Sequence, residues 1–365
     1  MKIQKEIELI AHSGLFDETF YLANNPDVKR LKVDPIQHFV EYGVKEKRNP
    51  SAQFDVAYYL EANPDVAKKG LNPFVHYIKY GQKEGRLPRY KYFLTLASCI
   101  RNEGKYLDEW LSYYIYQGVE HFYLNNDSST DNTMEVLEPY IQKGYVTVYE
   151  GLRAQGILQG EFHDKIINEK KFETQWCCFF DVDEFFQGKQ TIKELLPTFD
   201  DGVSAFELFW KFYGNSGHEK YEKKFMMERF THYACPVKNP DMGDTRICKS
   251  IVRLKDIEPA RSVHLFIPKT GIAINALFED LSNVSWEKRL NDGPILENYW
   301  INHYYCKSRE EYIEKINKGS CFYNNPKKWD RFHMVNKNDI EDDSMKTYIP
   351  IVEKIIFEIT GEKRF

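Results

Sequence analysis

The feature that most constrains the fold of this chain is an internal repeat near its N-terminus. Residues 16–50 align with residues 54–88 at a constant offset of 38 without a gap, and 16 of the 35 aligned positions are identical. Each copy contains Phe-Asp, Tyr-Leu, Asn-Pro-Asp-Val and Tyr-Gly at matching positions. Because proline disfavours helix for the residue before it and fits the first turn of a helix, each copy is expected to form two short helices. We therefore predict two tandem 38-residue helical hairpins over residues 14–90 that stack through their aromatic side chains.

Both copies also contain residues that could bind ligands. His38 and His76 lie beside aromatic residues on a helix face, where a histidine is more often a hydrogen-bonded structural group. Asp27 and Asp65 follow a proline at the start of a helix, which is typical of capping or turn residues. We predict structural roles for all four.

Composition excludes several classes of protein. The 365 residues carry a formal net charge of −5, which argues against a protein built to neutralise nucleic-acid phosphates. No run approaches the roughly 18 apolar residues of a membrane-spanning helix, and the first residues do not form an apolar leader. The 7 cysteines lack CxxC spacing, which favours reduced thiols without a zinc site. A cytoplasmic protein is expected, and peripheral association with the inner face of a membrane is compatible with the sequence.

From Tyr92 onward, short apolar runs alternate with helical periods. The expected strands are 92–100, 121–124, 145–149 and 176–180, and the expected helices between them are 106–117, 133–143 and 162–171. This alternation is typical of an α/β fold with a parallel sheet covered on both faces. Ligands of such sheets bind beyond the carboxyl ends of the strands.

Three carboxylates follow the last of these strands directly, in Asp181-Val182-Asp183-Glu184. Such crowding is unfavourable unless a cation neutralises the acids. Carboxylate oxygens suit Mg²⁺ or Mn²⁺, and an ion with open positions could act on a departing diphosphate. We therefore expect a metal site at this position.

These segments, in this order, resemble a known group of enzymes. Ile100-Arg-Asn-Glu103, the loop 126–133 and Asp181-Val-Asp-Glu-Phe185 are similar to the nucleotide-sugar half of GT-A glycosyltransferases. The segments 210–218, 248–253 and 302–308 resemble a family-2-like bacterial group close to glycosyltransferase family 92. The N-terminal repeats resemble hairpins attached to some bacterial glycosyltransferases. The resemblance implies a GT-A domain with a Rossmann-like mixed sheet over residues 91–320, an all-α region before it, and a helical tail over 321–365 that packs on the catalytic domain.

The resemblance also implies roles for individual residues. The expected donor-binding residues are Arg101, Asn102, Glu103, Asp127, Gln159, Asp164, Asp181 and Lys307. The expected ligands of Mn²⁺ or Mg²⁺ are Asp181, Asp183 and His303, with His264 as a rival. The expected acceptor-binding residues are Trp210, Gly214, Ser216 and His218. For several of them a structural role is an equal alternative, since Asp127 could cap the next helix and glycine loops are often only turns.

The catalytic base is not assigned by the sequence. Transfer with inversion needs a carboxylate that takes the proton of the acceptor hydroxyl. The candidates are Asp244, Asp241 and Glu207. Phe278-Glu279-Asp280 has the letters of the usual GT-A motif but lies in a polar region without a strand-to-helix context.

The sequence thus favours a metal-dependent, inverting glycosyltransferase. Its expected donor is a nucleotide sugar, with a UDP-sugar first, and its expected acceptor is a surface polysaccharide or a lipid-linked oligosaccharide. One alternative is a sugar-phosphate nucleotidyltransferase, which would need a glycine-rich phosphate loop that Ile100-Arg-Asn-Glu-Gly104 matches poorly. The other is a non-catalytic glycan-binding or scaffold protein that uses the repeats. Assembly of the chain into a homo-oligomer is compatible with the sequence.

Overall fold

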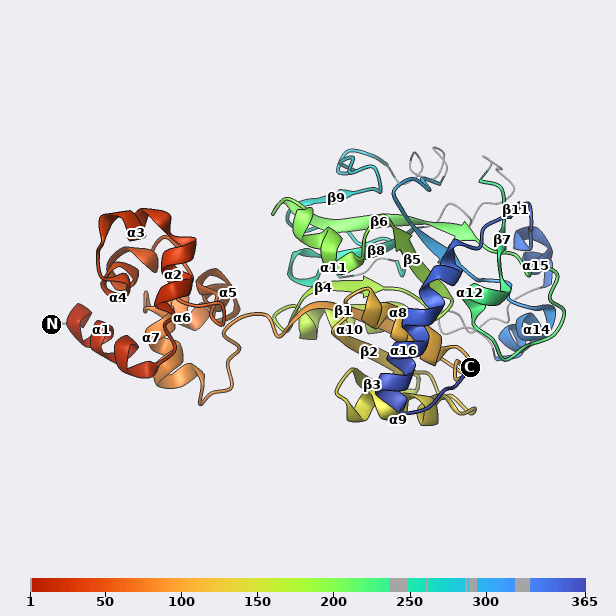
Figure 1. Cartoon of the computed structure of the whole chain (residues 1–365), viewed down its shortest axis with the longest axis horizontal. Coiled ribbons are helices and arrows are strands. Elements are labelled where there is room, and N and C mark those ends of the chain that lie inside the picture. Colours follow the sequence, from red (N-terminus) through yellow and green to blue (C-terminus); the bar gives the residue numbers. More distant parts are fainter. Residues whose placement is uncertain (1, 237–247, 260–261, 286–287, 289–293, 319–328) are drawn as a thin grey trace. The chain divides into compact units, whose positions relative to one another are not determined.

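The structure is a computed structural model that describes the chain apart from residues 1, 237–247, 260–261, 286–287, 289–293 and 319–328. The chain divides into two compact units, Met1–Lys91 and Tyr92–Phe365 (Figure 1). The first unit is entirely helical, and the second is built around a large sheet. Among the described residues, no helix combines the length and apolar character needed to cross a membrane.

Each repeat of the first unit forms three helical segments rather than the expected two. After α1 (Lys2–Ser13), the segments are α2 (Glu18–Asn24), α3 (Pro26–Leu31) and α4 (Pro35–His38) with the π-helical turn η1 (Phe39–Gly43), then α5 (Val56–Ala62), α6 (Pro64–Lys68) and α7 (Pro73–His76) with η2 (Tyr77–Gly81). The additional helix arises because the proline that ends one helix occupies the first turn of the next.

The same polar pair holds each repeat together. The hydroxyl of Tyr21 and Nδ1 of His38 lie 3.0 Å apart, and those of Tyr59 and His76 also lie 3.0 Å apart. A Cβ atom added at Gly43 would collide with the Tyr21 hydroxyl, so the Tyr-Gly of the repeat leaves room for this hydrogen bond. The two histidines are therefore structural, as the sequence predicted. The repeats stack through Phe74, whose ring centroid lies 5.7 Å from that of Phe39.

The sheet of the second unit is mixed. Its strand order is β3-β2-β1-β4-β8-β6-β10-β5, and β9 (Ile272–Ile274) pairs with β6. The strands β3 (Val146–Glu150), β2 (His121–Asn126), β1 (Tyr92–Ile100) and β4 (Thr174–Phe179) are parallel, whereas β8 (Cys248–Arg253) runs antiparallel to both β4 and β6 (Val203–Phe212). The strand β10 (Tyr299–His303) is parallel to β6 and antiparallel to β5 (Glu184–Gly188). The expected α/β fold with a mixed sheet, preceded by helices, is confirmed.

Side chains of β1 alternate between two cores, one on each face of the sheet. Leu94 and Leu96 belong to the core under α8 (Leu107–Tyr116), α9 (Thr133–Gln142) and α16 (Ile349–Thr360). Ala97 and Cys99 belong to the core that contains Phe162 of α10 (Gln159–Lys170). Helices thus cover both faces of the sheet, and the strand ends remain for the loops (Figure 1).

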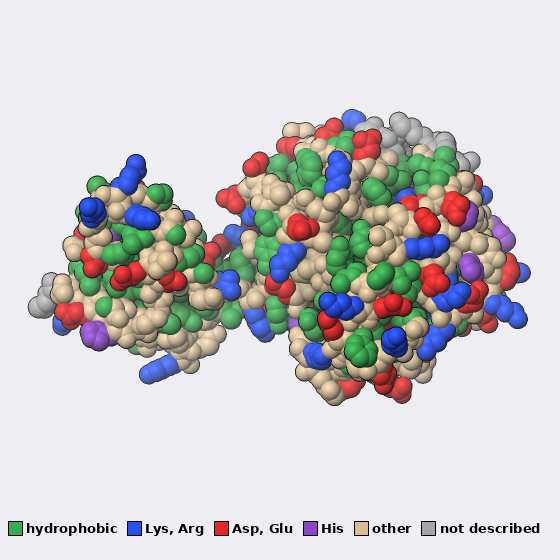
Figure 2. All heavy atoms as spheres, viewed as in Figure 1, with side chains coloured by type: hydrophobic (Ala, Val, Ile, Leu, Met, Phe, Trp, Pro, Cys, Tyr) green, Lys and Arg blue, Asp and Glu red, His purple; other side chains and the backbone are tan. Residues whose placement is uncertain are grey.

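Shorter elements complete the second unit. They are η3 (Arg153–Gln155), α11 (Ile192–Leu195), η4 (Leu196–Thr198), α12 (Met226–Arg229), β7 (His232–Tyr233), η6 (Leu254–Asp256), α14 (Arg309–Lys318), α15 (Trp329–Val335), β11 (Ile340–Glu341) and η7 (Ser344–Tyr348). Figure 2 shows acidic and basic side chains interspersed over the visible face of this unit, in keeping with the small net charge.

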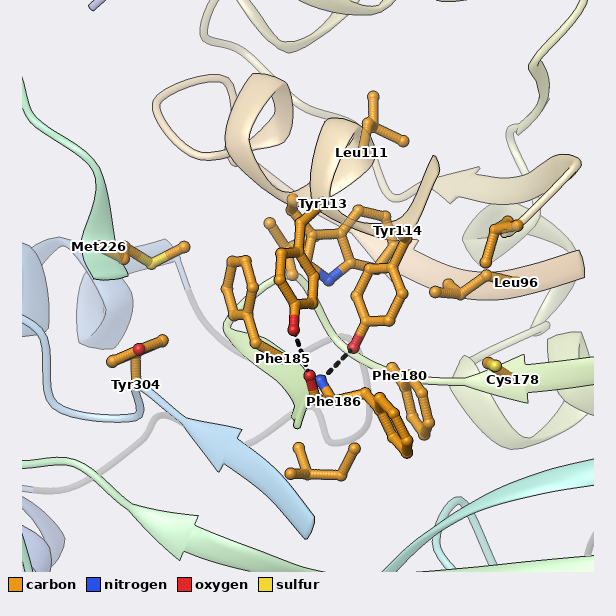
Figure 3. Packing of buried hydrophobic residues seen from close by; sticks show 14 of the residues in the cluster. Leu96, Leu111, Tyr113, Tyr114, Cys178, Phe180, Phe185, Phe186, Met226 and Tyr304 are labelled. Atoms are coloured by element: carbon orange, nitrogen blue, oxygen red, sulfur yellow. Dashed lines mark hydrogen bonds between the residues drawn. The ribbon is translucent and has the colours of Figure 1, made fainter. Parts of the chain in front are cut away.

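Two tyrosines of α8 fix the position of β5. The hydroxyl of Tyr113 donates a hydrogen bond to the carbonyl of Phe186 at 2.5 Å, and the backbone N–H of Phe186 donates to the hydroxyl of Tyr114 at 3.0 Å (Figure 3). The Tyr114 hydroxyl in turn donates to the carbonyl of Glu184 at 2.9 Å. Since Glu184 begins β5, these bonds also hold the acidic turn that precedes it.

Candidate active site

The acidic turn lies where the central strand β4 ends. The turn Asp181-Val182-Asp183 connects β4 with β5, and β5 pairs with β10 so that Glu184 stands opposite His303. The backbone N–H of Tyr304 donates to the carbonyl of Asp183 at 2.8 Å, which anchors the turn to the end of β10. Two distant segments of the sequence, one around residue 183 and one around residue 303, therefore meet beyond the carboxyl ends of β4 and β10.

The Asp183 carboxylate is surrounded by nitrogen atoms. Its Oδ2 lies 2.6 Å from Nζ of Lys315 and 3.4 Å from Nζ of Lys307. Its Oδ1 lies 3.5 Å from Nε2 of His303. Burial opposes ionisation, but the two ammonium groups outweigh it and hold the pKa of Asp183 well below its usual range.

A third buried lysine lies beside the other two acids of the turn. Nζ of Lys249, on β8, lies 2.9 Å from Oδ2 of Asp181 and 3.3 Å from Oε2 of Glu184. Burial raises the pKa of Glu184 well above its usual range, whereas for Asp181 the field of Lys249 outweighs burial and lowers the pKa. Oδ1 of Asp181 accepts a 2.8 Å hydrogen bond from the side-chain amide of Gln159, the first residue of α10.

The carboxylates of Asp181 and Asp183 are engaged by side-chain nitrogen atoms of the chain itself. Both oxygens of Asp181 and both oxygens of Asp183 already face side-chain nitrogen atoms. Across the residues with described positions, no group of three His, Cys, Asp or Glu side chains could hold a metal ion. The cations that this chain itself brings to the acidic turn are lysine ammonium groups. The expectation of Mn²⁺ or Mg²⁺, with Asp181, Asp183 and His303 as ligands, stays a prediction.

The two rival histidines both contact Trp210. Its ring centroid lies 4.5 Å from that of His303 and 5.2 Å from that of His264. Nε2 of His303 lies 3.5 Å from Oδ1 of Asp183, and His264 acts electrostatically on Asp181. Burial lowers the pKa of His303 to about 4, so its imidazole is neutral at pH 7. Both histidines therefore lie near the acidic turn, and the choice between them as a metal ligand stays a prediction.

A second ionic cluster lies at the ends of β1 and β2. Arg153 binds Asp127 in a bidentate manner, with Nε 2.6 Å from Oδ1 and a terminal nitrogen 2.7 Å from Oδ2. Arg101 lies 3.8 Å from the same carboxylate. Asp127 is 4% exposed, so this aspartate is a buried partner of two arginines rather than the helix cap that was its alternative. Asp131 caps instead, since it accepts from the backbone N–H and hydroxyl of Thr133.

The remaining donor candidates have mainly internal contacts. Asn102 has a left-handed φ of 52°, and its backbone N–H donates to the hydroxyl of Ser129. Glu103 pairs with Lys318 of α14. Asp164 lies on α10, in the turn after Gln159. The structure thus brings Gln159, Asp181, Asp183 and Lys307 together at the acidic turn and places Arg101, Asn102 and Asp127 at the neighbouring strand ends.

The acceptor candidates lie next to the C-terminal segment. Ser216 accepts hydrogen bonds from the backbone N–H groups of Thr231 and His232 at 2.9 and 3.0 Å. A Cβ atom at Gly214 would collide with Asn338, so this glycine permits close packing of the chain on itself. His218 lies 3.2 Å from Glu222. These contacts explain the residue types structurally, and an acceptor role for the loop stays a prediction.

Of the three candidate bases, only Glu207 lies among the described residues. It is 2% exposed on β6, where it stands opposite Ser250 of β8, and the Cys248 thiol lies 3.8 Å from its Oε2. Asp241 and Asp244 lie outside the described residues. Glu279 of the alternative motif accepts a hydrogen bond from Asn275 at 2.8 Å.

Sequence reasoning gave no role to three charged residues of these clusters. Lys249 lay inside a motif used for the resemblance, and a lysine in an otherwise apolar strand signals a buried acid partner. Arg153 and Lys315 gave no such signal. Lys315 belongs to the charged sequence of α14, where it could not be distinguished from a solvent-exposed lysine.

Comparisons with known proteins place the site in a family context. Residues 95–267 match the model of glycosyltransferase family 92. A glycosyltransferase family 92 protein of Oryza sativa subsp. japonica is 28% identical over 191 residues, which cover 50% of this chain and 31% of that protein. A galactan beta-1,4-galactosyltransferase of Arabidopsis thaliana is 32% identical over 125 residues, which cover 31% of this chain and 25% of that protein. The resemblance to family 92 that the sequence indicated is confirmed.

These matches have limited extent. The chain spans about a third of the length of the family 92 relatives, with 31% for the rice protein and 35% for one from Arabidopsis thaliana. Among solved structures, the Staphylococcus aureus protein TarS in complex with UDP aligns with 20% identity and a TM-score of 0.29 over 44% of this chain and 47% of that one. Asp127, Asp181, Asp183 and Lys249 lie inside the segment matched by the family model, whereas His303, Lys307 and Lys315 lie beyond it.

Proposed function

We propose that this chain, whose central segment matches glycosyltransferase family 92, transfers a sugar from a nucleotide-sugar donor to a glycan acceptor. The observation that carries the proposal is the buried group of lysines around Asp181 and Asp183, at the end of the central strand. Ligands of α/β sheets bind at this end of the strands. The family match and the similarity to a galactan beta-1,4-galactosyltransferase support sugar transfer as the reaction.

The chemistry of sugar transfer explains why cations are needed there. When the bond between the sugar and the nucleoside diphosphate breaks, negative charge develops on the departing diphosphate. Ammonium groups already held in place stabilise this charge without reorganising during the reaction. Lys307, 5% exposed at its side chain and next to Asp183, is suited to this role as a point charge.

The nucleoside would bind at the neighbouring strand ends. Arg101 and Arg153 are fixed there by Asp127, and their guanidinium planes could stack on a base or bind a ribose. A UDP-sugar is the donor that we propose first. A cytoplasmic location forms part of the same proposal, since five of the six cysteines with described positions are buried free thiols.

Inversion and metal dependence are the finer parts of the proposal. Inversion needs a base, and Glu207 is the candidate with a described position. Dependence on Mn²⁺ or Mg²⁺ rests on the spacing of Asp181 and Asp183, and the lysines compete with an ion for these carboxylates. Each part has its own measurement, namely the anomeric configuration of the product and the activity that remains after chelation.

The test is a turnover assay on the purified chain. A panel of nucleotide sugars is incubated with glycan acceptors, with Mn²⁺ or with a chelator, and release of the nucleoside diphosphate is measured. We expect at least one donor to be consumed in an acceptor-dependent manner. Asp183→Asn should abolish this turnover, whereas Asp201→Asn, at an exposed aspartate outside the site, should not change it.

Other outcomes would point elsewhere. Formation of a nucleotide sugar from a sugar phosphate and a nucleoside triphosphate would favour a nucleotidyltransferase. Glycan binding without consumption of any donor would contradict the proposal and favour a non-catalytic protein.

A further inference from the structure

Two buried ammonium groups share one carboxylate oxygen at the acidic turn. Lys307 and Lys315 both contact Oδ2 of Asp183, at 3.4 and 2.6 Å, and their side chains are 5% and 10% exposed. Like charges that share an oxygen repel each other, and buried charge is costly unless it is matched. Within contact distance of Asp183 the pairing is uneven, because two ammonium groups face one carboxylate and the third neighbour, His303, is neutral at pH 7. Glu103 acts on both lysines without contacting either of them.

Aromatic rings and a carbonyl support the two ammonium groups without neutralising them. Nζ of Lys307 lies 4.5 Å from the ring centroid of Tyr106, and Nζ of Lys315 lies 3.9 Å from that of Tyr305. Lys315 also donates a hydrogen bond to the carbonyl of Tyr305 at 3.0 Å. Such contacts orient an ammonium group and leave its charge available for a further anion.

Backbone conformation also contributes to this arrangement. Lys307 has a φ of 51°, in the left-handed region that a lysine rarely adopts. Strained residues of this kind persist where the surrounding structure holds them, and they concentrate at ligand sites. Lys315 is held differently, by α14, whose next inward lysine, Lys318, reaches the exit loop of β1 at the Asn102 carbonyl and Glu103. The helix therefore directs two lysines toward the ends of two strands.

We propose that Lys315, together with Lys307, binds the diphosphate of the donor, and that Asp183 holds both ammonium groups in position when no donor is bound. This inference rests on the proposed function and adds a residue that no sequence motif marked. A diphosphate has several charged oxygens, so it can accept hydrogen bonds from both ammonium groups at once. Asp183, in contrast, offers the two lysines the same single oxygen. Because the groups belong to the chain, inorganic pyrophosphate should bind in the presence of a chelator.

The test measures binding of inorganic pyrophosphate to the full chain by calorimetry, with a chelator and at constant ionic strength. We expect saturable binding to the wild type and about 10–100-fold weaker binding to Lys315→Met, since a hydrogen bond to a charged group is lost. Lys315→Arg keeps the charge and should recover part of the affinity. Lys354→Met removes a lysine whose side chain is 66% exposed on α16 and should bind like the wild type.

Melting temperatures without ligand separate a binding role from a structural one. Lys315→Met leaves Asp183 paired with Lys307, so the unliganded protein should melt close to the wild type while losing its pyrophosphate-induced stabilisation. If Lys315→Met does not fold, Lys307→Met tests the same site with the same expectation. The proposal is overturned if pyrophosphate does not bind the wild type, or if it binds and stabilises the lysine variants as well as the wild type.

Failure of this inference can be distinguished from failure of the proposed function. A wild-type chain that consumes a nucleotide sugar, with unchanged KM and kcat in Lys315→Met, would overturn the role of Lys315 and leave the function standing. A chain that binds pyrophosphate through Lys315 but consumes no donor would support the anion site and overturn the function.

Discussion

Charged side chains are paired differently in the repeats and at the acidic turn of the second unit. In the repeats, Arg48 pairs with Asp27 and Glu46, and Arg86 pairs with Asp65 and Glu84 in the same geometry. All of these groups reach solvent, and each cation has acids of its own. In the second unit, Lys307 and Lys315 are both buried on one oxygen of Asp183.

The difference teaches how structural charges can be separated from candidate functional ones. In the repeats, each arginine is matched by acids of its own repeat, and the pairing recurs in the second copy. A buried group with more cations than acids in contact is unfavourable on its own and becomes favourable when an anion binds. Unequal pairing at the acidic turn is therefore the feature that directs attention to a ligand.

The largest expected effect on stability follows from removing the charge of Asp183. Asp183→Asn leaves Lys307 and Lys315 buried without the carboxylate that both contact, and loss of one partner from such a cluster costs about 3–5 kcal/mol of unfolding free energy. The sequence alone suggested the opposite sign, because three crowded acids should repel each other. Chemical denaturation measures the change. Adding Lys307→Met and Lys315→Met to the variant should restore much of the lost stability.

A smaller effect concerns His163, a fully buried histidine of α10. Burial lowers the pKa of His163 to about 3, below an unfolded value near 6.5, so its contribution to stability is present above pH 6.5 and is lost as the pH falls toward 3. Between pH 6.5 and 5 the wild type should lose about 2 kcal/mol more unfolding free energy than His163→Phe, which has no group to protonate at this position. Unfolding free energies at several pH values test this expectation.

Matched variants of the repeats should have equal and modest effects. Tyr21→Phe and Tyr59→Phe each remove one hydrogen bond to a histidine, which corresponds to about 1 kcal/mol. Because the two pairs have the same geometry, the two losses of unfolding free energy should agree within about 0.5 kcal/mol. A loss confined to one repeat would show that the copies no longer share a structural role.

The smallest expected effect is on ligand binding after removal of the first unit. We propose that residues 14–90 bind an acceptor or partner, or mediate self-association, and take no part in the chemistry. A chain that begins at Tyr92, the start of the second compact unit, should bind pyrophosphate within about twofold of the full chain, because every residue of the anion site lies beyond that point. Calorimetry on both chains gives the comparison. A folded but non-binding truncated chain would contradict this division of roles.

Much of the framework could be predicted from the sequence because it depends on local patterns. The strand 92–100 has the bounds of β1, and the alternation from there to Phe180 gave the parallel half of the sheet. The acidic turn was recognisable because three carboxylates directly after an apolar strand are improbable without a cation. The extra helix of each repeat was missed because Asn-Pro was taken only as a stop, whereas Pro26 and Pro64 also begin helices.

The cations of the site could not be predicted in the same way. Lys249 lies 68 residues beyond Asp181 in the sequence, and Lys315 lies 132 residues beyond Asp183. Nothing in a local pattern indicates which strand neighbours β4 in the antiparallel half of the sheet, or which face of α14 is buried. Which lysines lie beside these acids therefore depends on tertiary structure, whereas the local pattern indicates only that some cation is needed there.

The hydrogen bonds from Tyr113 and Tyr114 to β5 have a practical consequence for how damage to this protein would be diagnosed. Both tyrosines belong to α8, which packs against α16 and whose Asp108 forms an ion pair with Arg364 at 3.0 Å. The C-terminal helix α16 thus supports α8, and α8 in turn holds β5 and the acidic turn in place. Removing the last twenty or so residues, none of which contributes a charged group to the acidic turn, would therefore lower activity in an assay by loosening the helix that positions the turn.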